Sequence, residues 1–256
     1  MARTSGTGRT VKSDETLLEI VLALKRMDGA GVTELANELG IAKSTAHSHL
    51  KTLHQYEFVV NEEGRYQVGL RFLDLGETAR HRKKEYQTVR EKVEELARQT
   101  DERAQFIVPE HGYGIYLYRA IGDHAVQTDS RIGKHIGLHA SSAGKAILAN
   151  MSDERVDEIL EKRGLPAVTE HTITDPDVLE KELARIRERG YGINKEESTQ
   201  GLRAVGVPIV GPDDEVLGAL SVSGPTHRMK GEWFESEIPD MILGAANEVE
   251  LNITFS

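Results

Sequence analysis

Cysteine is absent from this chain of 256 residues. Its absence excludes a disulfide scaffold, thiolate metal sites and any cysteine nucleophile. Long apolar runs are absent as well, since none approaches the roughly 20 residues that a membrane helix needs. The N-terminal stretch MARTSGTGRTVKSDE also lacks the apolar segment of a signal peptide. We therefore expect a cytoplasmic protein that makes no membrane contact.

Positive charge is scarce and unevenly distributed. The chain has 32 Lys and Arg against 42 Asp and Glu, a formal net charge of −10. Residues 1–90 hold 14 basic and 12 acidic residues, whereas the rest of the chain holds 18 and 30. The length is comfortable for two domains. The charge pattern favours a basic N-terminal contact surface beside an acidic domain, although acidic residues can also serve solubility in a salty cytoplasm.

Three helices are predicted in the N-terminal part. The first is indicated by apolar residues at helical spacing, namely Leu17, Leu18, Ile20, Val21 and Leu24. Ser13 or Asp14 is its candidate N-cap, residues 28–31 break it, and a second helix runs from Thr33 to Gly40. A third helix follows, with its cap at Lys43–Ser44.

Two short strands follow the third helix, because residues 58–60 and 65–68 flank the polar turn NEEG. Helix, helix, turn, helix and hairpin together form a winged helix-turn-helix. With Ala46, Leu50 and Leu53 facing inward, the outward face of the third helix is short, polar and able to hydrogen-bond, as a helix that reads the major groove must be. The candidate DNA-binding residues, including one on the hairpin, are Lys43, Ser44, Thr45, His47, Ser48, Lys51 and Arg65. A solvated face on a small protein-binding bundle is the alternative.

The remaining polar features of this region are less specific. His49 is expected to be packed or half-exposed, and His54 suits the negative end of the helix dipole. None of the histidines has a carboxylate or a second histidine at ligand spacing, so no metal site is expected. Arg3, Arg9 and Lys12 form a basic arm that could reach the DNA backbone or a minor groove. A solvated tail explains them equally well.

Residues 80–100, RHRKKEYQTVREKVEELARQT, carry one narrow apolar stripe made of Tyr86, Val89, Val93, Leu96 and Ala97. The stripe predicts a linker helix that packs against a partner subunit or the following domain. Beyond it, strand-like and helix-like segments alternate, which predicts an α+β domain with an antiparallel sheet and flanking helices. The expected strands are 104–108, 114–119, 124–128, 205–210 and 216–223, and the expected helices are 142–150, 155–163, 178–190 and 233–251.

Two motifs in this domain could bind a ligand. GLHASSAGKAIL, residues 137–148, is not a phosphate loop, because His139 and Ala146 stand where that loop needs Gly and Ser or Thr. It predicts a helix start whose N–H groups can bind a small carboxylate, or a small-residue turn for close packing. In SVSG, Ser221 and Ser223 share one face of a strand, where they can line a polar pocket or satisfy sheet neighbours. A serine nucleophile is disfavoured because no base, orienting carboxylate or nucleophile elbow accompanies them.

Five segments occur in a family-specific order: ELANELGIAKSTAHSHLKTL, HASSAGKAIL, RERGYGINKEES, GLRAVGVPI and GALSVSGP. Together they resemble the IclR family (isocitrate lyase regulator type) over residues 14–252. The resemblance implies an N-terminal winged helix, a linker helix and a C-terminal domain similar to GAF folds that binds small organic acids or aromatics. It also implies dimers formed through the N-terminal part, and often dimers of dimers.

Carried over residue by residue, the resemblance implies an effector pocket formed by Ile136, Ser142, Ala143, Asn194, Ala204, Ser221 and Ser223. The family usually has a carboxylate where Asn194 stands and a cysteine where Ala204 stands, so this pocket lacks a charge and a thiol. In the reading helix the family often has Arg where Ser48 stands and Leu where His49 stands. Base preference therefore does not transfer.

The sequence thus predicts an α+β protein, with a winged helix-turn-helix joined by a linker helix to a GAF-like sensor domain built on an antiparallel sheet. The expected bounds are 1–12 for a disordered basic arm, 13–76 for the DNA-binding domain, 77–100 for the linker and 101–256 for the sensor. We expect a regulator that binds a palindromic operator in double-stranded DNA as a homodimer or a dimer of dimers. It senses a small organic acid such as a sugar acid or keto acid, without catalytic residues, cofactor or metal. The alternatives are a GAF-like enzyme or small-molecule-binding protein that does not act on DNA, and a ligand-binding scaffold that has lost DNA binding.

Overall fold

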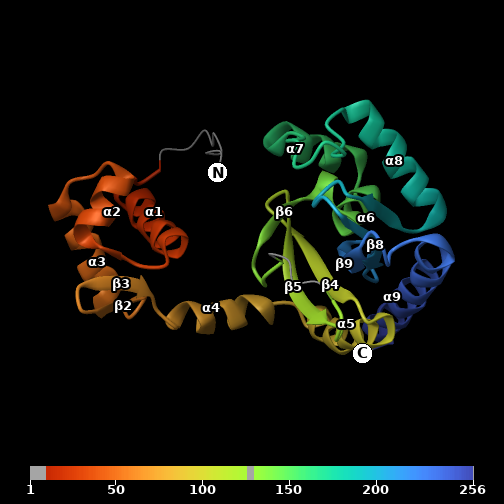
Figure 1. The fold of residues 1–256 in the computed structure, drawn as a ribbon, viewed down its shortest axis with the longest axis horizontal. Helices are drawn as coiled ribbons and strands as arrows, with labels where there is room; N and C mark the ends of the chain where they lie inside the picture. Colours follow the sequence, from red (N-terminus) through yellow and green to blue (C-terminus); the bar gives the residue numbers. More distant parts are fainter. Residues whose placement is uncertain (1–9, 126–129, 256) are drawn as a thin grey trace. The chain divides into compact units, whose positions relative to one another are not determined.

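The computed structural model describes residues 10–125 and 130–255 and divides into two compact units, one ending at Arg82 and the other beginning at Lys83 (Figure 1). Arg3 and Arg9 of the predicted arm lie outside the described residues. Lys12, also assigned to that arm, is instead the first residue of a helix. Within the described ranges, no helix combines the length and the apolar character needed to cross a bilayer.

The N-terminal unit is a helical bundle with a small sheet. Its elements are α1 (Lys12–Met27), β1 (Ala30–Gly31), α2 (Val32–Leu39), α3 (Lys43–Gln55), β2 (Val59–Glu62), β3 (Arg65–Val68) and α4 (Arg71–Arg80). The three strands are antiparallel in the order β1-β3-β2. Apolar side chains from α1, α2 and α3 meet in one core, which includes Ile20, Leu24, Leu35 and Leu50. The predicted winged helix-turn-helix is confirmed, with β1 as an additional short strand.

The helix starts differ from the expected caps. The N-cap of α1 is Val11, which makes no side-chain cap bond, so Ser13 and Asp14 lie inside the first turn. There the Asp14 carboxylate interacts favourably with the helix dipole. The N-cap of α3 is Ala42, again without a side-chain bond, which places Ser44 inside the helix. Both helix starts are exposed, so water can satisfy the first N–H groups without a capping side chain.

The predicted linker is interrupted. Helix α4 ends at Arg80, and a separate helix α5 runs from Glu85 to Thr100. The break falls in the run RHRKKE, where basic side chains three and four residues apart would repel one another along a continuous helix. The predicted apolar stripe is confirmed for α5, since its five side chains are buried within the second unit.

The C-terminal unit is built on one six-stranded antiparallel sheet with the order β6-β5-β4-β9-β8-β7. Its strands are β4 (Arg103–Glu110), β5 (Tyr113–Ile121), β6 (His135–Gly137), β7 (Gly192–Lys195), β8 (Leu202–Val210) and β9 (Val216–Pro225). Its helices are α5, α6 (Ser142–Ala149), α7 (Asp153–Arg163), α8 (Pro176–Arg189) and α9 (Ile238–Phe255), with short helical turns at Leu138–Ala140 and Trp233–Glu237.

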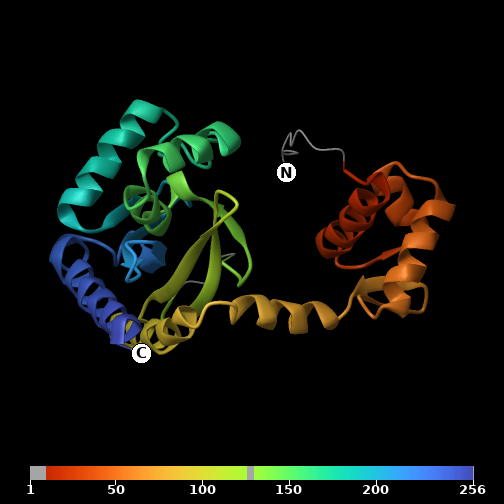
Figure 2. The ribbon, with the colours of Figure 1, turned by 180° about the vertical axis from the view of Figure 1, so that it is seen from behind.

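Helices cover both faces of this sheet (Figures 1 and 2). Helices α5 and α9 pack on one face, where Phe106 and Leu220 point into a core with Val93 and Ile242. Helices α6, α7 and α8 cover the other face, against which Ile107 and its strand neighbour Ala219 are buried. Because adjacent residues of a strand face opposite sides, β4 and β9 contribute to both cores.

One expected strand is wrong in its described part. The segment 124–128 was predicted as a strand, but Asp123 and His124 form a turn, and residues 126–129 lie outside the described residues. The Asp101 carboxylate accepts a hydrogen bond from the backbone N–H of His124 at 3.1 Å, which stabilises the turn. The next strand along the chain is β6, which pairs with the side of β5 opposite β4. The edge strand β7 was not anticipated, because its four residues are too few to show an alternating pattern.

Candidate functional site

The face of α3 that was predicted to read DNA is open to solvent. Ala46, Leu50 and Leu53 are buried, as expected from the helical period. The six candidate side chains of this helix, Lys43, Ser44, Thr45, His47, Ser48 and Lys51, are exposed. The Ser48 hydroxyl donates to the carbonyl of Ser44 at 2.9 Å, which leaves the Ser48 oxygen as an acceptor on the surface. The face therefore presents two cations between short polar side chains.

The hairpin of β2 and β3 is braced to the bundle through Arg65. Its Nη2 donates to the carbonyl of Gly29 at 2.6 Å, and its Nη1 lies 3.3 Å from the Glu34 carboxylate. The same carboxylate accepts from the backbone N–H of Gly31 at 2.9 Å. Since the Arg65 side chain is still half exposed, it both fixes the hairpin against α2 and keeps guanidinium surface available.

All seven residues predicted to bind an effector line one cavity of about 420 Å³ in the C-terminal unit. The sheet register explains part of this gathering, because Asn194, Ala204 and Ser223 lie side by side on β7, β8 and β9. Ser142, at the start of α6, places its hydroxyl 3.2 Å from that of Ser221. Ile136 of β6 and Ala143 of α6 complete the set.

The start of α6 lies very close to the sheet. Ser141 is its N-cap, and the Ser141 hydroxyl accepts from the N–H of Gly144 at 3.0 Å. A Cβ on Gly144 would stand 2.2 Å from the Leu138 carbonyl, and one on Gly206 would stand 2.5 Å from the nitrogen of Ala143. The small residues of this motif are therefore required for close packing. That packing also holds Ser142 and Ala143 at the cavity.

Two lining residues on β4 were not predicted from the sequence. Arg103 and Gln105 are 4% and 3% exposed, and both side chains donate to the Ser223 hydroxyl. The Nη2 and Nε of Arg103 lie 2.8 and 3.1 Å from that oxygen, and the Nε2 of Gln105 lies 2.7 Å from it. Burial lowers the pKa of the Arg103 guanidinium, which nevertheless stays protonated at neutral pH. The available signal was the alternation of two polar residues, Arg103 and Gln105, with apolar residues at the start of the strand.

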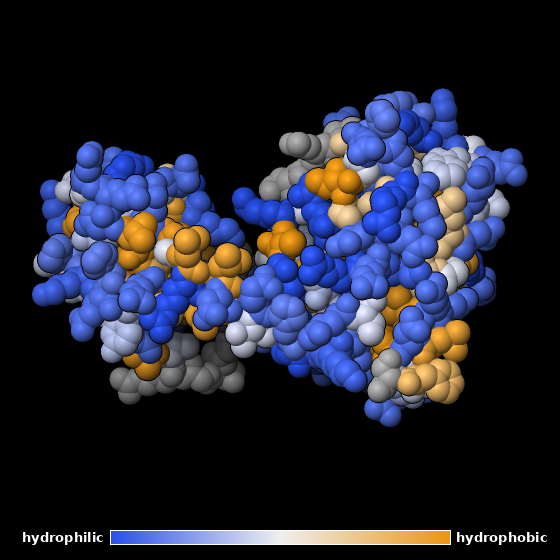
Figure 3. Space-filling view, turned by 90° about the horizontal axis from the view of Figure 1, so that it is seen from below, coloured by the Kyte–Doolittle hydropathy of each residue, from blue (hydrophilic) through white to orange (hydrophobic). Residues whose placement is uncertain are grey.

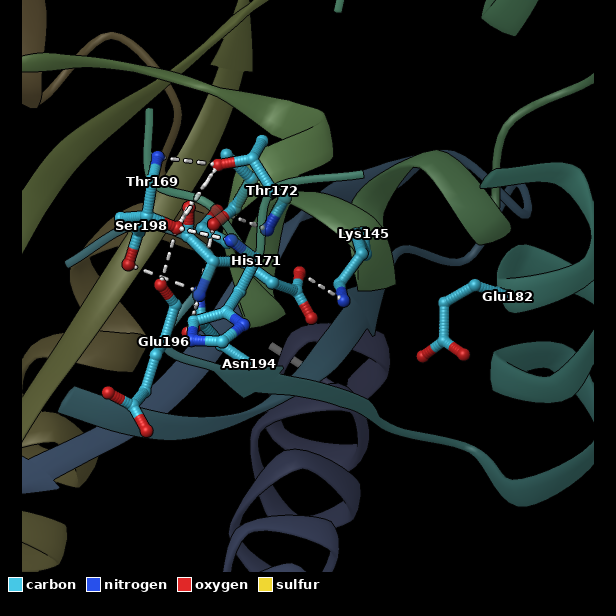
Figure 4. Close-up of polar contacts among 12 residues, drawn as sticks. Lys145, Thr169, His171, Thr172, Glu182, Asn194, Glu196 and Ser198 are labelled. Carbon is cyan, nitrogen blue, oxygen red and sulfur yellow. Dashed lines mark hydrogen bonds and ion pairs between the residues drawn. The ribbon is translucent and has the colours of Figure 1, made fainter. Parts of the chain in front are cut away.

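Asn194 has a structural role in the wall of the cavity (Figure 4). Its Nδ2 donates to the Ala140 carbonyl at 2.8 Å and to the Ser198 hydroxyl at 3.1 Å, and its Oδ1 accepts from the N–H of Glu197 at 3.2 Å. Both amide hydrogens are thus engaged within the protein. Toward a ligand, Asn194 can therefore act only as a hydrogen-bond acceptor.

The loop after β7 is also joined to two other segments. Glu197 pairs with Lys145 of α6, with Nζ and Oε2 2.5 Å apart and both side chains largely buried. The Thr172 hydroxyl donates to the Glu197 carbonyl at 2.7 Å, and that of Thr169 donates to the Glu196 carbonyl at 2.8 Å (Figure 4). These bonds fix the part of the cavity wall that includes Val168 and Ser198.

No cluster of three or more metal-ligating side chains occurs in the described part of the chain. His139 is buried, and its Nε2–H donates to the Pro166 carbonyl at 3.1 Å. Burial lowers the pKa of His139, more strongly than this hydrogen bond and the Glu197 carboxylate raise it. The imidazole is therefore neutral and acts as a structural donor near neutral pH.

Comparison with known proteins links both units to one group of regulators. A family profile described as "Bacterial transcriptional regulator IclR C-terminal" matches residues 81–251, and one described as "IclR helix-turn-helix domain" matches residues 16–63. The chain is 33% identical to the probable HTH-type transcriptional regulator ArcR of Halobacterium salinarum over an alignment of 256 residues. That alignment covers 98% of this chain and 97% of ArcR.

Solved structures show the same arrangement within each unit. The crystal structure of the IclR protein of Thermotoga maritima matches with a TM-score of 0.77 at 28% identity, over 94% of this chain and 97% of that one. An IclR homologue of Microbacterium hydrocarbonoxydans, complexed with 4-hydroxybenzoate, matches with a TM-score of 0.81 at 23% identity, over 94% and 99% of the two chains. The second similarity concerns the fold alone.

Proposed function

The chain belongs to the IclR family of transcriptional regulators, and we propose that it binds a palindromic operator as a homodimer and responds to a small organic acid. It is a regulator rather than an enzyme. The observation that carries the proposal is the combination, in one chain, of an exposed polar face on α3 and a lined cavity in the C-terminal unit. A ligand-responsive regulator requires both, and its operator DNA places it in the cytoplasm.

The DNA-binding part of the proposal assigns roles along α3. Lys43 and Lys51 contact phosphates, and Thr45 and His47 reach base edges in the major groove. The acidic charge of the chain does not oppose this, because the excess of Asp and Glu lies beyond residue 90. Phosphate contacts supply a large share of the affinity in such complexes. The hairpin is a wing beside α3, and Arg65 holds it in place while contacting the DNA backbone.

Dimerisation is supported by an apolar surface on the N-terminal unit, where apolar side chains gather on one face (Figure 3). Helix α4 has no buried residue among those described, and Leu73 and Leu75 on it are 59% and 48% exposed. Leu70, just before it, is 84% exposed. Apolar patches of this kind on a regulator mark protein contacts. We assign the patch to a second copy of the chain. Light scattering of the intact protein then distinguishes monomer, dimer and dimer of dimers, and Leu73→Lys should shift the mass toward the monomer.

The effector part of the proposal places a sugar acid or keto acid in the 420 Å³ cavity. Ser221, Ser223 and Ser142 supply hydroxyls, Ala143 supplies backbone at the start of α6, and Ile136 supplies an apolar wall. Lys134 and Arg103 bring positive charge to the same lining. The structural neighbour from Microbacterium hydrocarbonoxydans was solved in complex with 4-hydroxybenzoate, which is also an organic acid.

The decisive experiment is fluorescence anisotropy of a duplex from the region upstream of the chain's own coding sequence, with and without candidate acids. We expect sequence-specific binding that changes when an acid is added. A protein that binds an acid but shows no preference for any DNA would instead be a GAF-like small-molecule-binding protein that does not act on DNA. Failure to bind both would contradict the proposal entirely.

A further inference from the structure

Two loops meet at one side of the cavity. The first, residues 164–175, joins α7 to α8, and the second, residues 196–201, joins β7 to β8. A second hollow of about 460 Å³ lies here, and every residue that lines it belongs to one of these two loops. Val168, Ser198 and Thr199 line both the hollow and the cavity. Since Val168 is 57% exposed, the loops flank a mouth through which the cavity reaches the protein surface.

Two threonine hydroxyls join the loops. The Thr172 hydroxyl donates to the Glu197 carbonyl at 2.7 Å, and the Thr169 hydroxyl donates to the Glu196 carbonyl at 2.8 Å (Figure 4). The Thr169 oxygen also lies 3.3 Å from the Glu197 carbonyl. Because each hydroxyl has a single hydrogen to donate, the connection between the loops depends on two hydrogens.

The Thr172 hydroxyl also organises its own loop. Its oxygen accepts from the backbone N–H of Val168 at 3.0 Å and from that of Thr169 at 2.9 Å. The backbone of Val168, whose side chain lies at the mouth, is therefore held by the same hydroxyl that reaches across to the second loop. Breaking the bond to Glu197 would release the two residues together from that loop.

The two loops differ in how the rest of the protein holds them. Glu197 of the second loop pairs with Lys145, and its N–H donates to Asn194. The first loop is held at one end, where the Pro166 carbonyl accepts from His139, and at the other, where Ile173 packs against the core beside α6. Between these two anchors, Thr169 and Thr172 make its hydrogen bonds to other described segments. A surface segment held by so few bonds is suited to open locally.

Resting on the proposed function, in which a small molecule enters this cavity, we infer that the two loops form a gate and that Thr169 and Thr172 are its latch. With both hydroxyl bonds made, residues 168–171 are held against the second loop. When the bonds open, this segment moves away from Ser198 while Lys145 keeps the second loop in place, and the mouth widens. The gate sets how fast a molecule enters and leaves, whatever that molecule is.

The test follows the access of a small reagent to the cavity and needs no effector. The chain has no cysteine, so Ala204→Cys introduces a single thiol into the cavity lining, at a position that is 6% exposed. The full-length protein is treated with iodoacetamide, and mass spectrometry of the intact chain gives the rate of alkylation. In the same background, Thr169→Val combined with Thr172→Val removes both hydroxyls.

We expect the thiol of Ala204→Cys to be alkylated about 10-fold or more faster in the double valine variant, because two hydrogen bonds no longer hold the gate closed. Thr169→Val alone leaves the Thr172 bonds in place and should accelerate alkylation by about 3-fold. Thr169→Ser combined with Thr172→Ser keeps both hydroxyls, so its rate should stay within about 2-fold of the rate in Ala204→Cys alone.

Two controls separate the gate from a general loosening of the fold. Thr88→Val on α5 removes a hydroxyl that also donates to a backbone carbonyl, at 2.7 Å, and should leave the rate unchanged. Ala246→Cys, made in place of Ala204→Cys, puts the thiol in the core on the opposite face of the sheet, where Ala246 is 2% exposed. The double valine variant should not accelerate alkylation there.

The opposite outcomes overturn the inference. Equal rates with and without the valine substitutions show that the hydroxyls do not control access. Equal acceleration of the Ala246→Cys thiol assigns the effect to general loosening, and a serine variant as fast as the valine variant removes the hydroxyls as the cause. If circular dichroism shows that the double valine variant is unfolded, Thr169→Val decides, and an unchanged rate in it contradicts the gate. The assay uses neither DNA nor effector, so it is judged separately from the regulator function.

Discussion

The buried ion pair of Lys145 and Glu197 gives a sharp test of what holds the sensor unit together. The Lys145 side chain on α6 is 1% exposed, and that of Glu197 in the loop after β7 is 11% exposed. Removing one partner of a buried pair leaves the other charge uncompensated, at a cost of about 3–5 kcal/mol. Because the two side chains differ in exposure, the cost of removing one partner should differ from the cost of removing the other. Glu197→Gln leaves a charge that cannot reach water, whereas Lys145→Met leaves a carboxylate near the edge.

We expect Glu197→Gln to lower the free energy of unfolding of the sensor unit by about 3 kcal/mol, and Lys145→Met to lower it by about 1–2 kcal/mol. For a unit of this size, 3 kcal/mol corresponds to a fall of about 6–12 °C in the unfolding midpoint. The chain has one tryptophan, Trp233, which lies in this unit. Its fluorescence therefore reports the unfolding of the sensor unit separately from that of the N-terminal unit.

An exposed ion pair on α7 serves as the control. Arg155 and Glu158 also lie 2.5 Å apart, but their side chains are 54% and 64% exposed. Glu158→Gln should change the free energy of unfolding by less than about 1 kcal/mol. The reasoning from burial is refuted if Glu158→Gln and Glu197→Gln have equal effects, or if Lys145→Met proves the more destabilising member of the buried pair.

Three further changes test the other assignments. Lys51→Ala should weaken binding to all DNA sequences and reduce the slope of log affinity against log salt by about one. The control Lys25→Ala on α1 should leave both the affinity and the slope unchanged. An unaltered slope in Lys51→Ala would remove Lys51 from the interface. Burial lowers the pKa of His139 below its ordinary value near 6.5. Between these two pKa values the unfolded chain binds a proton at His139 that the folded chain does not. The free energy of unfolding should therefore fall as the pH drops from about 6.5 toward the folded pKa. His139→Gln should flatten that decline in urea unfolding, and an unchanged decline would assign it to other groups. Ser221→Ala combined with Ser223→Ala should abolish the acid-induced change in operator affinity while basal DNA binding persists, and a normal response would place the pocket elsewhere.

Much of the local structure could be predicted because it depends on residues close together in the chain. The helical period of Ala46, Leu50 and Leu53 indicated which face of α3 is buried. The strand period likewise placed Ser221 and Ser223 on one side of β9. Helix starts were less predictable. An exposed first turn can be satisfied by water, so Val11 and Ala42 serve as caps without the side-chain oxygen that pattern reasoning requires.

The family resemblance grouped pocket residues whose closeness no spacing rule could show. The prediction that they bind an effector stays a prediction, but the structure places all seven around one cavity. Asn194 shows the limit of such a transfer. An asparagine amide can in general donate to a ligand, but both hydrogens of this amide are engaged by Ala140 and Ser198. Whether a polar group faces a ligand or its own protein depends on neighbours that come from other segments.

Residue types and their periods alone determined that this chain forms a winged helix-turn-helix followed by an antiparallel α+β domain. Only the tertiary structure decided which polar and charged side chains meet. Arg103 and Ser223 are 120 residues apart in sequence and hydrogen-bonded in the sheet, and Lys145 and Glu197 are 52 residues apart and paired in the interior. The physical reason is that strand order and register bring distant residues together. The energy of a charge then depends on burial and on those partners, which a one-dimensional pattern does not contain.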